Sequence, residues 1–339
     1  DAVAPAAAQR LERQSPGQAR LSVVAGNVRE LLGKLEKIVD EGFEEVQAKP
    51  QRVALVLSSQ GAAAGSFATF RLLQTLASSA SEEEHQPWAG LKKNVTSTSP
   101  VFQESYGRSF EAAAYASLLG AATAFLEDLG ISPVLICGHG YVGEVAALAA
   151  AGAIGAAEGM ALAAKGSMDN SGYWPPCVPV ASSSTGAFTE RPRASYFTSK
   201  MQEDNDLRPS SVAGLVSAAK AANCTAVMEV CIGPAFVSAS LRAIELEMKQ
   251  IAASIGPPAD GRCVSGDAAQ RAILEAAASL FTAGGVVNFA RAVGSGPVSW
   301  LPPRPLAPQL CWPGNPAAAE RTRREEHVDA FHAQWAPAA

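Results

Sequence analysis

The sequence predicts an α/β protein in which helices pack against a mostly parallel sheet. Two continuous apolar runs, Arg52–Leu57 and Pro133–Cys137, lack the polar alternation of a half-exposed strand. Such runs are typical of strands that are buried on both faces of a parallel sheet. Each run ends in a polar or glycine-rich turn, and segments with helical spacing of apolar residues lie around them. Alternating strands and helices are the pattern of a layered α/β fold.

Composition and charge exclude several classes of protein. The chain has 339 residues, of which 48% are hydrophobic and 17% charged, and its net charge is −5. For this length we expect one domain with flanking linkers. The acidic balance argues against binding to nucleic acid or to an anionic membrane surface. We also expect no membrane span, because no apolar run is long enough.

The cysteines predict the compartment of the protein, and the first residue bears on the extent of the chain. The six cysteines include no C-x-x-C pair, so we expect reduced thiols in a cytoplasmic protein rather than a disulfide framework. No signal peptide is recognisable. The first residue is Asp1 rather than methionine, and we interpret the chain as a piece of a longer one.

The remaining elements follow from local patterns. Residues 1–20, rich in alanine, proline and glutamine, are expected to be a flexible linker, and Leu21–Ala25 a short strand. Asn27 is the expected N-cap of a helix whose apolar residues recur from Val28 to Val39. The charged segment 81–100 is predicted to be irregular. Further strands are expected at 178–182 and 225–231, and helices at 105–129, 144–150, 156–164, 211–222, 237–250 and 267–283.

Four segments, in the family's order, resemble the malonyl-CoA:carrier-protein transacylase-like domains of polyketide and fatty-acid synthases. They are Val53–Gly61 (VALVLSSQG), similar to VAFVFPGQG; Leu126–Ile154, with LEDLGISP, GHGYVGE and VAALAAAGAI; Val178–Gly186 (VPVASSSTG), similar to VPVYSTVTG; and Met228–Pro234 (MEVCIGP), similar to FLEVGPHPVL. The resemblance covers nearly the whole chain. It implies a three-layer α/β-hydrolase-like acyltransferase core with a mostly parallel sheet.

The resemblance also divides the chain. Residues 21–50 resemble the end of the linker between a ketosynthase and an acyltransferase, and 51–290 the acyltransferase core. Residues 291–339 contain LPPRPL, similar to the LPTYPF linker that follows the core. Leu274–Val287 is similar to a helix of polyunsaturated fatty acid and enediyne synthases. Near 166–177 the chain connects directly to the next strand, so we expect the family's ferredoxin-like small subdomain to be deleted.

The family's chemistry needs a serine that this chain lacks. In the family a serine on a strand–helix elbow attacks an acyl-CoA thioester, a histidine takes its proton, and the phosphopantetheine thiol of a carrier protein removes the acyl group. Here the elbow reads Gly138-His139-Gly140-Tyr141-Val142-Gly143-Glu144, one residue longer than the family's motif. The serine position falls on Gly140 or Tyr141. We predict that Tyr141 is a packed or surface aromatic, because a phenol has a pKa near 10.

The other site residues are remnants as well. The catalytic histidine belongs to the missing subdomain, and His139 matches a histidine that supports structure in the family; the remaining histidines are His85, His327 and His332. Gln60 with Gly61 matches the oxyanion loop. The position of the arginine that binds a malonyl carboxylate falls near Lys165 or Gly166. Glu144 opens the elbow helix, where the helix dipole favours a carboxylate. We expect no metal site and no cofactor of the domain's own.

Three functions are open at this point. The first is a catalytically inactive acyltransferase-like scaffold beside a ketosynthase and an acyl carrier protein, possibly docking a separate acyltransferase. The second is an active transacylase or thioester hydrolase with a rebuilt site, for which Cys137, Tyr141 and Ser182–Ser184 are the nearby nucleophiles. The third is a non-catalytic module that binds an acyl chain or CoA in an open, shallow cleft. The tail, with Trp300 and Trp312, is interpreted as packing along a neighbouring domain or as a plain linker.

Overall fold

The computed structural model describes most of residues 20–289. The described residues are 20–41, 49–59, 66–79, 88–107, 109–166, 173–188, 196–197, 199–200, 211–243, 248–256 and 266–289. All belong to the first of two units, Asp1–Ser299. The predictions for residues 1–19, Gln60, Gly61, His85 and 290–339 lie outside the described residues, and those include Trp300, Trp312, His327 and His332.

The sheet has six strands in the order β4-β3-β2-β1-β5-β6. Every neighbouring pair is parallel except β3 with β4, which is antiparallel. The predicted mostly parallel sheet is therefore confirmed. The strands are β1 (Val53–Ser58), β2 (Leu135–His139), β3 (Val180–Ser182), β4 (Gly186–Ala187), β5 (Ala226–Cys231) and β6 (Lys249–Ser254).

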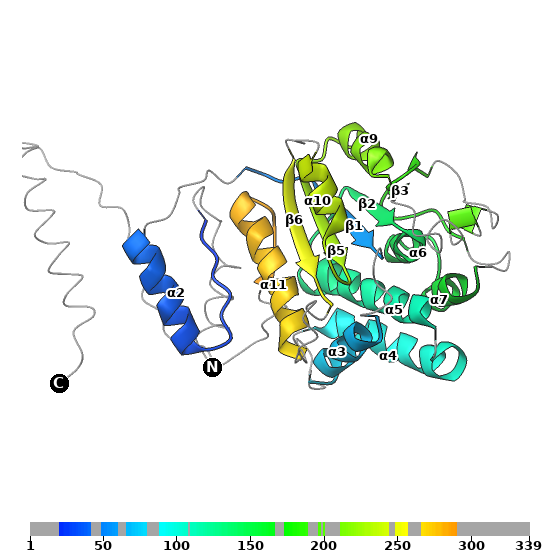
Figure 1. The fold of residues 1–339 in the computed structure, drawn as a ribbon, viewed down its shortest axis with the longest axis horizontal. Helices are drawn as coiled ribbons and strands as arrows, with labels where there is room; N and C mark the ends of the chain where they lie inside the picture. Colours follow the sequence, from blue (N-terminus) through cyan, green and yellow to red (C-terminus); the bar gives the residue numbers. More distant parts are fainter. Residues whose placement is uncertain are drawn as a thin grey trace, which may run out of the picture. The chain divides into compact units, whose positions relative to one another are not determined.

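Helices cover both faces of this sheet, which gives three layers (Figure 1). On the central strand β1, Val53, Leu55 and Leu57 pack into the larger core, while Ala54 and Val56 pack into the smaller core on the other face. On the larger core's side lie α3 (Ser66–Ser79), α4 (Ala89–Val101), α5 (Phe110–Thr123), α6 (Tyr141–Ala150), α7 (Ala156–Lys165) and α11 (Gly266–Ala283), and on the other side α9 (Ala213–Ala221) and α10 (Phe236–Ala243).

The N-terminal segment confirms one expectation and corrects another. Helix α2 (Val28–Glu41) begins as predicted, because the Asn27 Oδ1 accepts a hydrogen bond from the Glu30 N–H at 2.9 Å. Leu21–Ala25 forms no strand. Instead the Ser22 hydroxyl lies 2.7 Å from the Thr282 hydroxyl of α11, so side-chain contacts replace sheet pairing there.

Two further predictions were wrong because the local pattern of apolar residues is weak. Residues 89–100 lie within the segment that was predicted to be irregular, but they are part of α4. The few apolar residues of α4 are separated in the sequence by lysines, serines and threonines, so no helical spacing is recognisable. Helix α4 continues into a π-helical turn, η1 (Phe102–Tyr106). The helix expected over 237–250 ends at Ala243, and β6 follows at the sheet edge. Only Ile251 and Ala253 of β6 are buried, so its strand pattern is too short to recognise locally.

The long helix expected over 105–129 is interrupted. A new helix, α5, begins at Phe110, where the Ser109 Oγ accepts a hydrogen bond from the Ala112 N–H at 3.1 Å. It ends in a second π-helical turn, η2 (Ala124–Asp128). Almost all of α5 is buried, and its alanines and glycine allow it to cross the sheet closely.

Candidate functional site at the carboxyl edge of the sheet

The elbow between β2 and α6 is a turn of a single residue. Strand β2 ends at His139, α6 begins at Tyr141, and Gly140 between them has φ 73° and ψ 162°. This conformation is essentially restricted to glycine. The prediction of a lengthened turn was therefore wrong, because the extra residue is taken up in the first turn of α6. Of the two positions left open for a nucleophile, Gly140 is the one on the turn.

Two glycines bring the elbow close to the sheet. A Cβ on Gly138 would lie 2.2 Å from the Glu144 Cα, and a Cβ on Gly143 would lie 2.3 Å from the Leu57 carbonyl oxygen. Ser59 joins both sides of the turn: its N–H donates to the His139 carbonyl at 3.0 Å, and its Oγ accepts from the Gly143 N–H at 3.1 Å. These glycines are needed for packing, whether or not the elbow does chemistry.

Tyr141 is a packed aromatic, as predicted. Its side chain is buried, and its hydroxyl donates a hydrogen bond to the Leu162 carbonyl of α7. Its ring packs edge-on against Phe197 at 6.5 Å between centroids. The oxygen therefore lies in the protein interior, where the hydrogen bond to Leu162 occupies it.

His139 is fully buried and neutral. Its Nδ1 lies 2.8 Å from the Ser183 Oγ, and its ring stacks on Phe236 at 5.2 Å. Burial first, and then the positive charge of Lys200, lower the pKa of His139 from 6.5 to about 4. The imidazole supports the packing between β2 and α10, which agrees with the structural role that the resemblance implies.

Glu144 is a buried carboxylate in the first turn of α6. Its Oε1 accepts from the Ser182 hydroxyl at 2.5 Å, and its Oε2 accepts from the Tyr196 hydroxyl at 2.7 Å. The helix dipole adds to these bonds. Burial, followed by the nearby Glu144 charge, raises the pKa of Tyr196, so its phenol keeps its proton and remains a donor.

Comparison with known proteins identifies this arrangement at the level of the fold. No family model matches the chain, and no curated protein matches it in sequence. The acyltransferase domain from module 8 of the salinomycin polyketide synthase superimposes with a TM-score of 0.52 at 14% identity, over 86% of this chain and 96% of that one. The chain has the fold of a polyketide synthase acyltransferase domain.

A second solved structure to which the chain is similar is the acyltransferase domain of the iterative polyketide synthase in enediyne biosynthesis. It is 16% identical, covers 76% of this chain and 80% of its own, and has a TM-score of 0.43.

The fourth segment of the sequence resemblance, Met228–Pro234, also has a structural explanation. Glu229 of β5 is fully buried, and its two carboxylate oxygens accept from the N–H groups of Val237 and Ser238 at 3.0 and 2.7 Å. It therefore caps the start of α10, where a negative charge is favoured by the dipole. Since α10 carries the Phe236 ring, this cap helps to hold the ring on His139.

Lys200 and Tyr196 are site residues that the sequence analysis missed. The Lys200 Nζ donates to the Ser184 Oγ at 2.7 Å, and the Ser184 Oγ lies 3.0 Å from the Ser182 Oγ. A chain of hydrogen bonds thus runs from Lys200 to Glu144. Neither residue belongs to a recognisable motif, and no sequence signal places them beside the elbow.

The alternative nucleophiles are poorly placed for attack. Burial first, and then Glu144, raise the pKa of the Cys137 thiol, which is fully buried on β2. Ser183 is bonded to His139 but is itself buried. Ser184 is partly exposed, yet its partner Lys200 is the donor in their hydrogen bond, and an ammonium group cannot take the serine's proton.

Lys165 lies apart from the elbow network. It is the exposed last residue of α7, and its Nζ lies 5.4 Å from the centroid of the Tyr106 ring. It lines a cavity with Tyr106, Gly107 and Ser109, and no elbow residue is part of that wall. Gln60 and Gly61 lie outside the described residues, so the carboxylate-binding and oxyanion assignments stay predictions.

The described part of the chain contains no candidate metal site and no candidate membrane-spanning helix. Among these residues no group of three or more histidine, cysteine, aspartate or glutamate side chains is arranged to hold a metal ion. None of the helices that the structure describes is both long and apolar enough to span a bilayer.

Proposed function

We propose that this chain is a catalytically inactive acyltransferase-like domain of a polyketide multienzyme and that it acts as a structural scaffold. The observation that carries the proposal is Gly140, because the residue on the one-residue turn has no side chain to attack a thioester. The neighbouring Tyr141 is committed to a hydrogen bond in the core. The similarity of the fold to an acyltransferase domain of a polyketide synthase supports the multienzyme context.

The arrangement of retained and lost groups supports a structural role. Glu144, Glu229 and His139 are buried polar groups, and each is hydrogen-bonded to the frame. Such groups are expensive to bury without partners. The residues that keep the fold together are therefore present, whereas the elbow lacks the nucleophile. This is the pattern expected when folding rather than chemistry has been kept.

The partners follow from the same resemblance. A ketosynthase is the neighbour expected at residues 21–50, and an acyl carrier protein or a separate acyltransferase is the partner that a scaffold would position. The phosphopantetheine belongs to the carrier protein, and the domain needs no cofactor of its own. The assembly would work in the cytoplasm.

Acyl loading is the experiment that tests the proposal. The purified chain is incubated with acetyl-CoA and with malonyl-CoA, and its intact mass, free CoA and the loading of an added acyl carrier protein are measured. We expect an unchanged mass and an unloaded carrier protein. Free CoA should appear no faster than in buffer without the protein. An active acyltransferase domain serves as the positive control. A stable acyl adduct on this chain would overturn the proposal.

The scaffold role has its own test in the parent multienzyme. Deletion of residues 51–290 should abolish product formation, because the spacing of the neighbouring domains is lost. Ser184→Ala removes a partly exposed hydroxyl group and should leave the product yield unchanged. A loss of product in the Ser184→Ala variant would instead favour a rebuilt catalytic site.

A further inference from the structure

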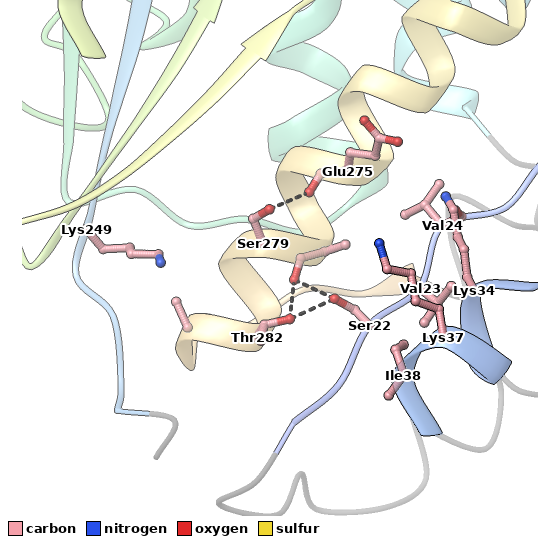
Figure 2. A pocket seen from close by; sticks show the side chains of 12 residues that line it. Ser22, Val23, Val24, Lys34, Lys37, Ile38, Lys249, Glu275, Ser279 and Thr282 are labelled. Atoms are coloured by element: carbon pink, nitrogen blue, oxygen red, sulfur yellow. Dashed lines mark hydrogen bonds between the residues drawn. The ribbon is translucent and has the colours of Figure 1, made fainter. Parts of the chain in front are cut away.

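One face of α2 is attached to α11. Arg271 of α11 forms an ion pair with Glu30 and another with Glu275. Figure 2 shows Lys34, Lys37 and Ile38 of α2 beside a cleft of about 660 Å³, with Glu275, Ser279 and Thr282 of α11 on its other side. The face of α2 that carries Glu30, Lys34 and Ile38 is thus directed towards the rest of the domain.

A second face of α2 is apolar and exposed. Val28, Leu32, Leu35 and Val39 are 63%, 53%, 38% and 80% exposed, and no residue of α2 is buried. Their spacing of four, three and four residues places them on one stripe along the helix, as in the seam of a coiled coil. A stripe of this kind is a mark of an interaction surface.

The stripe is complementary to itself. Its spacing reads the same in both directions, so an antiparallel second copy of α2 would place Val28 against Val39 and Leu32 against Leu35. Arg29 and Glu36 border the stripe on the side away from Ile38. With a rise of 1.5 Å per residue, Arg29 would lie within about 3 Å, along the helix axis, of Glu36 of the second copy. Two opposite-charge pairs would then close the contact.

A parallel arrangement lacks this complementarity. In a parallel pair, the side of one helix that carries Arg29 would face the side of the other that carries the apolar Leu31. No opposite-charge pair would then form. Like or unmatched charges beside a seam select against an arrangement. The apolar spacing and the charge positions therefore agree on the antiparallel pair.

We propose that α2 is a dimerisation element, and that its Val28–Leu32–Leu35–Val39 stripe pairs antiparallel with the same stripe of a second copy of this chain. A helix of 14 residues makes a smaller contact than a standard protein interface. We expect association in the micromolar range for the isolated chain. In a multienzyme, other contacts raise the local concentration to about the millimolar range, where such a contact is saturated. This use rests on the proposed scaffold function, whereas the dimer itself does not.

The oligomeric state of the full chain tests the proposal. Sedimentation equilibrium from about 1 to 500 µM, a range chosen to bracket micromolar affinity, should show a monomer that becomes a dimer. Leu32→Glu with Leu35→Glu should stay monomeric over the whole range. Val39→Glu should weaken the dimer, whereas Val286→Glu, at an equally exposed valine of 82%, should not. Circular dichroism checks that each variant is folded.

Charge reversal tests the orientation. Arg29→Glu alone and Glu36→Arg alone should each weaken the dimer about tenfold, since each breaks both intermolecular pairs. The double variant restores opposite charges and should recover the wild-type dissociation constant. A parallel pair predicts no such recovery, and its absence overturns the antiparallel proposal.

A monomeric wild-type chain at 500 µM, well above micromolar affinity, would overturn the dimer. Removal of residues 300–339 then separates two explanations for the covered stripe. A shortened chain that dimerises shows that the tail occupies the stripe, and one that remains monomeric leaves the stripe to a different protein. Both results contradict the proposal, and neither affects the acyl-loading test.

Discussion

The Tyr141 hydroxyl donates a hydrogen bond to the Leu162 carbonyl oxygen and so joins α6 to α7. The same carbonyl accepts the Gly166 N–H at 2.8 Å, which closes the C-terminal end of α7. The Tyr141 phenol, directly after Gly140, therefore connects two helices. This hydrogen bond accounts for a bulky aromatic side chain directly after the turn.

Tyr141→Phe tests the strength of this bridge. The variant keeps the ring and removes the hydroxyl, while the Leu162 carbonyl retains its bond from Gly166. We expect a loss of about 1 kcal/mol, which is the net contribution of a typical hydrogen bond. The melting temperature should fall by about 2–4 °C for a domain of this size, as measured by calorimetry. An unchanged melting temperature would show that the bridge contributes nothing.

Gly140→Ser tests whether the elbow could be revived by one change. The serine would have to adopt φ 73° and ψ 162°, which costs a non-glycine residue about 1–3 kcal/mol. His139 is stacked under Phe236 and bonded to Ser183, so it is not available as a base. We expect no malonyl transfer from malonyl-CoA to a carrier protein. Robust transfer by this variant would contradict the account.

Gly138→Ala tests the close approach of β2 and α6. The new Cβ would lie 2.2 Å from the Glu144 Cα, and the backbone cannot yield cheaply. We expect a loss of about 3 kcal/mol or more, or failure to fold. Gly33→Ala is the matched control, because no atom outside the neighbouring helix backbone lies within 4 Å of the added Cβ. That change should stabilise α2 by up to about 1 kcal/mol, and urea titrations of both variants provide the comparison.

The stability of the protein should fall in mild acid because of His139. Its pKa in the folded state is about 4, compared with 6.5 for a free histidine. The unfolded chain therefore binds a proton between these values when the folded chain does not. Stability from this group is complete above about pH 6.5, and it is lost as the pH falls towards 4, by at most about 3 kcal/mol.

Urea unfolding at pH 7.5, 6 and 5 measures this effect. His139→Gln removes the titrating group, and its unfolding free energy should depend less on pH over the same interval. The variant is expected to be less stable at pH 7.5, because the stacking on Phe236 is lost. Parallel pH profiles for the variant and the wild type would show that His139 is not the cause.

Local patterns determined much of this protein. The buried parallel strands β1 and β2 were predicted from continuous apolar runs, and the start of α2 was predicted from Asn27, because both signals come from neighbouring residues. The absence of a serine at the elbow is also a property of the sequence alone. Such features depend on contacts that the adjacent chain supplies, or on residue identity itself.

The tertiary structure decided what distant residues do together. Lys200 meets Ser184, and Tyr196 meets Glu144, only because two strand ends and a separate segment converge at one edge of the sheet. The one-residue turn at Gly140 depends on how far α6 extends, which the packing of Tyr141 on α7 determines. Lys165 lies beside Tyr106 for the same reason, since the end of α7 is positioned by long-range packing rather than by its own sequence.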